Sequence, residues 1–462
     1  MEPITIIGGG LAGCEAAYQC ASQGQKVVLY DMKPNHFSPA HESKDLAELV
    51  CSNSFRSDDR TSAVGLLKEE MRRMGSLLMQ VAEQTKVPAG SALAVDRGEF
   101  ARIITETIEQ HPLITVIREE IQHIPETGLT ILATGPLSSK ALTAHLGTLT
   151  GEDHLAFYDA IAPIIVADSL NDAIVFSASR WEKGPGDYLN CPMDKEQYQS
   201  FSEALLAGEK VPLKEFEDKK YFEGCLPIEV MNERGVDTLR FGPMKPVGLI
   251  DPRTGKEAYA VVQLRMENRE GSYYNMVGFQ TKLTYGAQKK IFRMIPGMEN
   301  CEFLRLGSIH RNTFVCGPKV LEPTLQMKKH PHILLAGQIS GVEGYVESTA
   351  IGLLAGRNVA ALAKGDDISL PPRNTAHGAL IHHLTTEVKR FQPTNVNYSL
   401  FPPFDKPAYK ASVPEAERAL HKKGKGKRKR WRISKREKAT FRSEMALVAL
   451  GDWLDGVDNE NI

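Results

Sequence analysis

The sequence lacks the features that would place it in a membrane or outside the cell. None of its apolar runs is long enough to cross a bilayer as a helix. No secretory leader is expected, because an apolar strand pattern begins within four residues of the first methionine. The seven cysteines include no C-x-x-C pair, and their odd number argues against a disulfide framework or a structural zinc site. We therefore expect a cytoplasmic protein with reduced thiols and no metal.

Net charge is nearly absent as well, but the charges are unevenly distributed. The 462 residues carry a formal net charge of −1. Between His421 and Lys438, eleven Lys or Arg residues stand against one Glu, so this segment carries about +10 and the rest about −11. This segregation indicates that one end of the molecule binds a polyanion.

What the sequence does contain is a glycine-rich turn near its start, in ITIIGGGLAGCE. Gly8, Gly10 and Gly13 have the G-x-G-x-x-G spacing between a β-branched run and a predicted helix over residues 13–23. A second strand, QKVVLYD, ends at Asp31, where a carboxylate can accept hydrogen bonds from a ribose. The helix N-terminus would face the phosphates. These residues predict a dinucleotide site.

A second glycine-rich element indicates a larger cofactor than NAD. The segment PHILLAGQISGVEGYVES reads as a buried strand, a glycine turn and a helix of small residues. A bipartite cofactor such as FAD needs such a second element beside the first. A strand that closes at Thr134 and Gly135 offers further backbone contacts. The predicted cofactor-binding residues are Gly8, Gly9, Gly10, Leu11, Ala12, Gly13, Asp31, Thr134, Gly135, Gly337 and Gln338.

The remaining pattern divides the chain into four segments. Helical periodicity predicts one helix over residues 64–83, and Asp96 is a candidate N-cap of another. The turn-rich stretch from Lys33 to Arg60 is expected to form a loop over the cofactor. A last helix is expected over residues 438–454. The predicted domains are 1–150 and 306–405 for the cofactor, 151–305 as a substrate-facing insertion, and 406–462 as basic tail and C-terminal helix.

The sequence contains a series of long, unusual strings. They are GGGLAGCEAA, PAHE, AELVCSNS, AVGLLKEEMRRMGSL, VPAGSALAVDR, FYDAIAPI, DYLNCPM, FEGCLPIEVM, TLRFGPMKPVGL, YAVVQLR, YNMVGFQTKL, HRNT, AGQISGVEGYVES and FQPTNVNY. In these strings the chain, to about Phe404, resembles one family, the folate- and FAD-dependent tRNA uracil-5-methyltransferases called TrmFO, relatives of the GidA (MnmG) flavoproteins.

The resemblance implies an α/β fold, in which a glutathione-reductase-type, Rossmann-like FAD-binding domain is interrupted by an α+β insertion domain and followed by a basic C-terminal tail. It also implies methylation of carbon 5 of the T-loop uridine, position 54 of tRNA, to give ribothymidine. The carbon would come from 5,10-methylenetetrahydrofolate by way of reduced flavin, and the electrons from NAD(P)H.

Two cysteines are the predicted catalytic residues. Carbon 5 of uracil is a poor nucleophile, and addition of a thiolate to carbon 6 activates it. Cys51, in ELVCSNS, and Cys225, in FEGCLP, lie in polar or Gly-Pro contexts that suit reactive thiols. Both match the family's functional cysteines. The sequence leaves open which one attacks; we favour Cys225 as the nucleophile and place Cys51 near the flavin. The other five cysteines are expected to be structural.

Further residues are candidate ligands for folate and tRNA. His310, in HRNT, and Tyr345, in GVEGYVES, are predicted to contact the folate pterin. His382 and His383 are expected on a solvated helix face, because no third metal ligand is spaced to join them. In the basic run, tRNA contacts are predicted for Lys427, Arg428, Arg430 and Trp431, since cations and an aromatic suit RNA binding.

Three alternatives remain open from the sequence. A GidA-like enzyme would modify the wobble uridine, a plain flavin oxidoreductase would act on a small molecule, and an FAD-carrying RNA-binding protein would catalyse nothing. The sequence does not decide the oligomeric state, the preference for NADH or NADPH, or the contacts that select the uridine.

Overall fold

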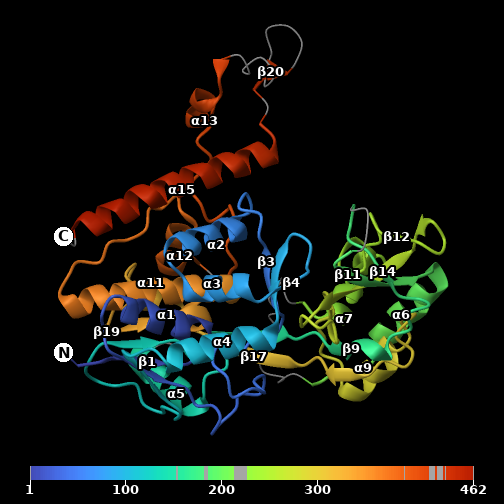
Figure 1. Cartoon of the computed structure of the whole chain (residues 1–462), viewed down its shortest axis with the longest axis horizontal. Coiled ribbons are helices and arrows are strands. Elements are labelled where there is room, and N and C mark those ends of the chain that lie inside the picture. Colours follow the sequence, from blue (N-terminus) through green and yellow to red (C-terminus); the bar gives the residue numbers. More distant parts are fainter. Residues whose placement is uncertain are drawn as a thin grey trace.

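The structure, a computed structural model, describes residues 2–151, 155–181, 186–212, 226–389, 391–415, 422–423, 430–431 and 433–460. Three parts are visible in Figure 1: an α/β region around the N-terminus, a second lobe at the right, and C-terminal segments along the top. In the described ranges, no helix is long and apolar enough to cross a membrane.

The α/β region is built on a six-stranded sheet with the order β18-β19-β7-β1-β2-β6. Its pairings are parallel except at the edge strand β18. The strands are β1 (Ile4–Ile7), β2 (Val27–Tyr30), β6 (Ile114–Ile117), β7 (Thr130–Leu132), β18 (Gln326–Met327) and β19 (His330–Leu335). Strands from residues 4–132 and 326–335 therefore share one sheet, which requires the residues between β7 and β18 to leave it and return.

Each face of this sheet is covered by helices. Ile6 belongs to an apolar core shared with α1 (Leu11–Ser22), α4 (Arg97–Glu109) and α11 (Tyr345–Lys364). The next residue, Ile7, belongs to a separate core with α5 (Lys140–Thr150). Adjacent residues of a strand point to opposite faces, so the sheet is sandwiched between the two helical layers.

Helices α1 and α11 cross in close contact because both carry small residues. A Cβ atom on Gly352 would lie 2.3 Å from the carbonyl oxygen of Ala12, and one on Gly356 would lie 2.6 Å from that of Ala16. Any side chain at these glycines would push the helices apart. This contact holds the two glycine-rich elements, far apart in sequence, against each other.

The predicted helix over residues 64–83 is wrong, because the chain breaks it in two. Helix α2 covers Ala63–Arg73 and α3 covers Leu77–Gln84. Between them, Gly75 adopts φ +76°. Ser76 caps α3 by accepting a hydrogen bond from the amide of Met79 at 3.3 Å, and its hydroxyl donates to buried Glu15 at 2.7 Å. A left-handed glycine followed by a serine cap ends one helix and starts the next.

The strand before Asp96 and its helix cap agree with the prediction, whereas the predicted loop over residues 33–60 ends in a strand, β3 (Ser54–Ser57). Strand β5 (Ala92–Val95) leads into α4, and the Asp96 side chain accepts a hydrogen bond from the amide of Glu99 at 3.0 Å. The C-terminal helix α15 (Lys435–Glu460) is longer than predicted. A small sheet, β3-β5-β4, adds β3 (Ser54–Ser57) and β4 (Lys86–Val87).

The second lobe contains an antiparallel sheet with the order β10-β11-β14-β15-β9-β16 and its own apolar core. Strands β8 (Leu155–Ala160) and β17 (Ile309–Phe314) pair with each other and join the lobe to the α/β region. The strands are β9 (Ile164–Val166), β10 (Phe176–Ser177), β11 (Tyr188–Met193), β14 (Ala260–Met266), β15 (Tyr273–Met276) and β16 (Phe303–Arg305). The hairpin is β12 (Ile250–Asp251) and β13 (Lys256–Glu257), and the helices are α6 (Lys195–Ala207), α7 (Ile228–Glu233), α8 (Thr238–Phe241) and α9 (Tyr285–Phe292).

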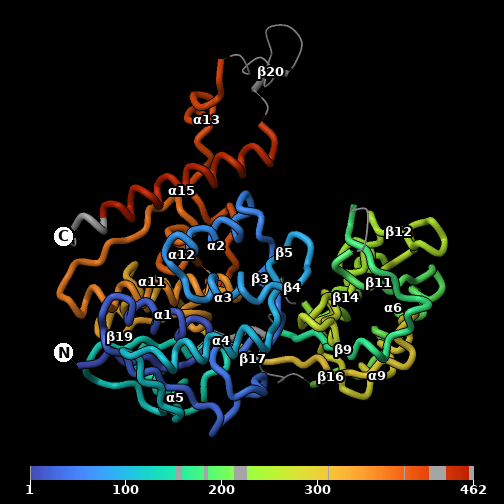
Figure 2. Tube along the Cα trace, in the orientation of Figure 1, coloured from blue at the N-terminus to red at the C-terminus, as the bar shows by residue number. Residues whose placement is uncertain are grey.

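The C-terminal segments lie along one side of the α/β region. Helix α15 packs on α2, and Figure 2 shows it running across the top of that region. The remaining helices are α10 (Gly317–Val320), α12 (Ala376–Thr385) and α13 (Lys406–Ser412), with 3-10 turns at Ala167–Ser169 and Gly337–Ser340. Strands β20 (Lys422–Lys423) and β21 (Arg430–Trp431) pair within the basic run.

Candidate cofactor and thiol site

A cavity opens where the glycine turn, the end of β2 and the turn before α11 meet. All predicted cofactor-binding residues line it except Gly13. The lining includes Gly8, Gly9, Gly10, Leu11, Ala12, Asp31, Thr134, Gly135, Gly337 and Gln338. The two glycine-rich elements thus contribute to one cavity, as a bipartite cofactor requires.

The three spaced glycines have different structural roles. Gly8 adopts φ +109°, and a Cβ atom on it would lie 2.5 Å from the carbonyl oxygen of Ala133. A Cβ atom on Gly13 would lie 1.8 Å from the carbonyl oxygen of Gly8, so this glycine lets helix and strand pack. A Cβ atom on Gly10, at the start of α1, would meet nothing within 4 Å. Its open side is where a diphosphate can approach the helix N-terminus.

Asp31 is fixed at the edge of the cavity by backbone amides. Its side chain accepts hydrogen bonds from the amide of Gly9 at 2.9 Å and from that of Lys33 at 2.8 Å. Each carboxylate oxygen has a further lone pair that can accept a hydrogen bond from a ribose hydroxyl. The carboxylate therefore fits the predicted ribose contact.

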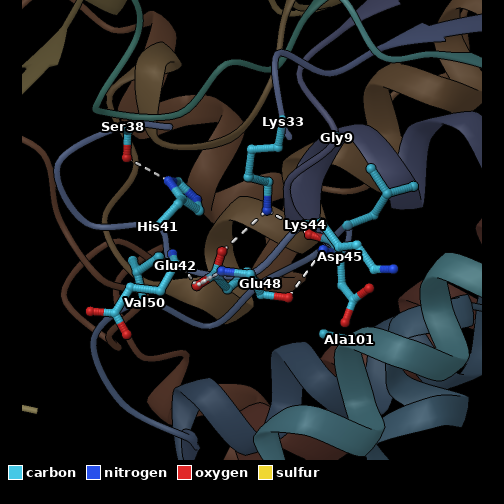
Figure 3. Close-up of polar contacts among 12 residues, drawn as sticks. Gly9, Lys33, Ser38, His41, Glu42, Lys44, Asp45, Glu48, Val50 and Ala101 are labelled. Carbon is cyan, nitrogen blue, oxygen red and sulfur yellow. Dashed lines mark hydrogen bonds and ion pairs between the residues drawn. The ribbon is translucent and has the colours of Figure 1, made fainter. Parts of the chain in front are cut away.

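The loop after β2 forms another wall of the cavity, and a buried ion pair lies within this loop (Figure 3). The Lys33 ammonium lies 3.2 Å from the Glu48 carboxylate, and both side chains are less than a tenth exposed. Glu48 also accepts hydrogen bonds from the amides of Glu42 and Ser43 at 2.8 and 3.1 Å. Lys33, Glu48 and nearby His41 line the cavity, although sequence reasoning did not identify them. The ion pair holds this loop together with Leu46, Ala47 and Leu49, which are fully buried in the main apolar core.

Cys51 follows this loop and lies beside the cavity. Its amide donates a hydrogen bond to the Tyr345 hydroxyl at 2.6 Å, and the amide of Ser52 donates to the same oxygen at 3.2 Å. Tyr345 itself lines the cavity. Burial, and then the proximity of Cys51, raise the pKa of Tyr345, so the phenol stays protonated at neutral pH. The tyrosine predicted to contact folate thus also holds the backbone of the candidate catalytic cysteine.

Two buried guanidinium groups hold the rest of the Cys51 loop. Arg265 donates hydrogen bonds to the Ser52 hydroxyl at 2.7 Å and to the Asn53 side chain at 3.0 Å. Arg97 donates to the carbonyl oxygen of Leu49 and to Glu267 at 3.0 Å. Cationic side chains near a thiol are characteristic of reactive cysteines. This environment supports the functional interpretation of Cys51.

The remaining cysteines differ in their surroundings. Cys225 lies outside the described residues, so its predicted role stays a prediction. Cys14, Cys20 and Cys191 are fully buried, and this burial raises their pKa well above that of a free thiol. Burial raises the pKa of Cys301 to about 11. These four thiols remain protonated at neutral pH and are suited to packing.

His310 lies on β17 near the junction of the two lobes and does not line the cavity. Its Nε2 atom is 2.8 Å from the Ser308 hydroxyl. Burial, with smaller contributions from Arg305 and His41, lowers the pKa of His310 to about 4. The imidazole is therefore neutral at pH 7 and can stack or exchange hydrogen bonds without carrying charge.

A buried carboxyl group beside the cavity was also missed by sequence reasoning. Glu343 accepts a hydrogen bond from the side chain of Gln338, which lines the cavity. Burial raises the pKa of Glu343 well above its usual value, and nearby Asp159 raises it further. A glutamate in a glycine-rich turn gives no sequence signal, because its burial depends on the distant strand β8.

The other predicted ligands are only partly described. Lys427 and Arg428 lie outside the described residues, and Arg430 and Trp431 are described only as backbone of β21. On α12, His382 is exposed, whereas His383 stacks on Phe391 with ring centroids 5.2 Å apart. Within the ranges given above, no three His, Cys, Asp or Glu residues form a group that could hold a metal ion.

Comparison with known proteins now identifies the family. Residues 3–367 match the family described as glucose inhibited division protein A. The chain is 62% identical over 409 residues to a methylenetetrahydrofolate-tRNA-(uracil-5-)-methyltransferase TrmFO of Desulfotalea psychrophila, covering 88% of this chain and 92% of that protein. It is 56% identical to the protein of the same name from Geotalea uraniireducens, over 98% of this chain and 99% of that one.

Solved structures agree at the level of the fold. Aquifex aeolicus GidA, in its form II crystal, superposes with a TM-score of 0.64 at 17% identity, over 85% of this chain and 68% of that chain. The fold is thus that of the GidA-like flavoproteins. The chain belongs to the glucose inhibited division protein A family, in its TrmFO branch.

Proposed function

We propose that this chain is a folate- and FAD-dependent tRNA methyltransferase. It transfers the one-carbon unit of 5,10-methylenetetrahydrofolate to carbon 5 of uridine 54 in tRNA, with electrons from NAD(P)H. The observation that carries the proposal is the Cys51 loop, held by Tyr345 at the edge of a glycine-lined dinucleotide cavity, in a chain 62% identical to a TrmFO protein. The proposed location is the cytoplasm.

The proposed domain division follows the shared sheet. Residues 1–150 and 306–405 form the FAD-binding domain, since β1, β2 and β7 pair in one sheet with β19. Residues 151–305 form the insertion domain, with a separate sheet and core. Residues 406–462 form the basic tail and last helix.

The residues fit FAD, because Gly10 leaves open the space at the α1 N-terminus that a diphosphate needs. The α1 N-terminus would hold the diphosphate, Asp31 the ribose, and Gly337 and Gln338 the second half of the cofactor. FAD held there in its reduced form would supply the one-carbon and hydride chemistry that the conversion of a methylene to a methyl group needs.

The thiol chemistry belongs to the chain itself. A thiolate adds to carbon 6 of the uracil, and the electron pair moves toward the carbonyl at carbon 4, which makes carbon 5 nucleophilic. After the carbon unit is attached, loss of the carbon 5 proton releases the carrier of that carbon and leaves an exocyclic methylene on the uracil. Hydride addition to this methylene gives the methyl group and an enolate, which expels the thiolate. We assign the attack to Cys225 and place Cys51 at the flavin side. His310, neutral at pH 7, and Tyr345 contact the pterin.

The thiol assignment is tested by replacing each cysteine. Cys225→Ala is expected to abolish methylation while FAD absorbance stays normal, and Cys51→Ala is expected to impair the flavin-side steps as well. The matched control is Cys191→Ala, which removes a buried thiol far from the cavity loop. Full methylation by Cys225→Ala would disprove its role as nucleophile but leave the function intact.

The site of methylation separates this proposal from the GidA-like alternative. Unmodified tRNA is offered beside a tRNA that carries cytidine at position 54, and labelled methyl groups are counted. We expect incorporation only in the first tRNA. Equal incorporation in both, with the label at the wobble position, would favour the alternative.

A further inference from the structure

Two aromatic side chains of the second lobe are unusually exposed. Phe241 is 80% exposed and Trp181 is 77% exposed, more than any other large apolar side chain of the described chain. Aromatic side chains at this exposure lose apolar contact with the protein and are typical of binding surfaces. Neither belongs to the cofactor cavity.

Trp181 is rigidly held in its exposed position. It adopts φ +66°, which is unfavourable for a residue with a side chain. Its amide donates a hydrogen bond to the carbonyl oxygen of Gly248 at 3.2 Å. A Cβ atom on Gly248 would lie 2.8 Å from the indole ring, so the indole rests on glycine backbone. One side of the ring is therefore supported and the rest faces solvent.

Arg180, which precedes Trp181, holds the segment on which the indole rests. Arg180 donates hydrogen bonds to the carbonyl oxygens of Val247 at 2.7 Å and Lys245 at 2.6 Å. It also donates to the side chain of Gln263 at 2.9 Å. This clamp keeps the indole in place before any ligand arrives, which reduces the entropy lost on binding.

Phe241 and free cations extend the surface. Phe241 is the last residue of α8 and lies four residues before Lys245, whose carbonyl oxygen accepts a hydrogen bond from Arg180. Because Arg180 directly precedes Trp181, the two aromatic residues are on neighbouring segments. Lys245 and Lys256 are exposed and form no ion pair with any described residue. Exposed rings and exposed lysines on neighbouring segments are the composition of a nucleic-acid stacking surface.

Phe241 also borders a hollow of the second lobe that Leu226 lines, and Leu226 directly follows Cys225 in the sequence.

We propose that Trp181, together with Phe241, is a stacking platform for bases of the tRNA loop that contains the target uridine. This inference rests on the proposed function, because a uridine stacked in a folded loop must be extruded before a thiol can reach carbon 6. The bases left behind lose their stacking partners, and the preformed indole replaces them.

Binding of unmodified tRNA by the full chain tests the platform. Stacking contributes enough per base that Trp181→Ala is expected to raise the Kd for tRNA about tenfold or more, with a smaller effect for Phe241→Ala. Trp181→Phe should retain most of the affinity. The slope of log Kd against log salt should not change, because no phosphate contact is removed. Tyr285→Ala is the matched control, an aromatic 60% exposed on α9 of the same lobe.

A spectroscopic readout separates stacking from a structural effect. In a Trp431→Phe, Trp453→Phe background, Trp181 is the remaining tryptophan and its fluorescence should be quenched on adding tRNA. Thermal unfolding and flavin absorbance of Trp181→Ala should match the wild type. Unchanged tRNA affinity in Trp181→Ala, or loss of self-association with normal tRNA affinity, would overturn the platform. A wild-type chain that neither binds nor methylates tRNA would instead overturn the proposed function.

Discussion

At the scale of single residues, the glycines of the turn have two different roles: one leaves space for the cofactor and another allows the fold to pack. Gly10 and Gly13 belong to the same motif, but a methyl group at Gly10 would enter open space and one at Gly13 would meet backbone at 1.8 Å. When FAD is absent, the free energy of unfolding of Gly10→Ala is therefore expected to lie within about 1 kcal/mol of the wild-type value. Its Kd for FAD should rise at least about tenfold, since the methyl group occupies the space of the diphosphate.

Gly13→Ala provides the matched control for this prediction. Overpacking against the Gly8 carbonyl should lower the free energy of unfolding by about 1–3 kcal/mol or more, with or without FAD. Urea unfolding and titration of FAD fluorescence measure the two quantities. Normal FAD affinity in Gly10→Ala would mean that the diphosphate does not lie at the α1 N-terminus.

His310 gives a prediction about pH. Its pKa is about 4 in the folded protein, against 6.5 for a free histidine side chain. Between these values the unfolded chain binds more protons, so the contribution of His310 to stability is lost as pH falls from 6.5 toward 4. Allowing for partial exposure, wild type should lose about 1 kcal/mol more than His310→Gln between pH 7 and 5. Urea unfolding at both pH values decides this, and equal losses would contradict it.

At the scale of elements, one arginine joins the second lobe to the cofactor loop. Arg305, at the end of β16, donates hydrogen bonds to the carbonyl oxygens of Val50 at 3.0 Å and Ala40 at 2.9 Å. Arg305→Met should speed amide hydrogen exchange across residues 40–51 and weaken FAD binding, because these bonds order a cavity wall.

Arg305→Lys serves as the control, since it keeps the charge but not the two-pronged donor geometry. In Arg305→Lys, the amides of residues 40–51 should exchange at a rate between those of the wild type and Arg305→Met. Exchange in Arg305→Met that matches the wild type would show that the hydrogen bonds of Arg305 do not order this loop.

The elements also show how far sequence reasoning reaches. The glycine turn and the Asp96 cap were predictable, because each depends on residues a few positions away. Asp31 was predictable because an acid at the end of the second strand is part of the dinucleotide-binding pattern. The break at Gly75 was missed because the apolar period continues through it, although Gly75 and Ser76 carried the signal. Lys33, Arg265 and Glu343 were missed for another reason: their partners come from loops or strands that only the fold brings together.

At the scale of the whole molecule, the basic run is expected to supply phosphate contacts. Deleting residues 422–430 removes seven of its Lys or Arg residues. The deletion should weaken tRNA binding and flatten the dependence of log Kd on log salt, while flavin reduction by NAD(P)H is unchanged. Filter binding at several salt concentrations measures both. Unchanged affinity and slope would show that the run does not contact tRNA.

The most direct test follows the transferred carbon. The full chain with bound FAD is given unmodified tRNA, NAD(P)H and 5,10-methylenetetrahydrofolate deuterated at the methylene carbon. Nucleosides from position 54 are then analysed by mass spectrometry. The account predicts ribothymidine whose methyl group carries both deuterium atoms, with no S-adenosylmethionine present. Unlabelled ribothymidine, or deuterium only at the wobble uridine, would contradict it.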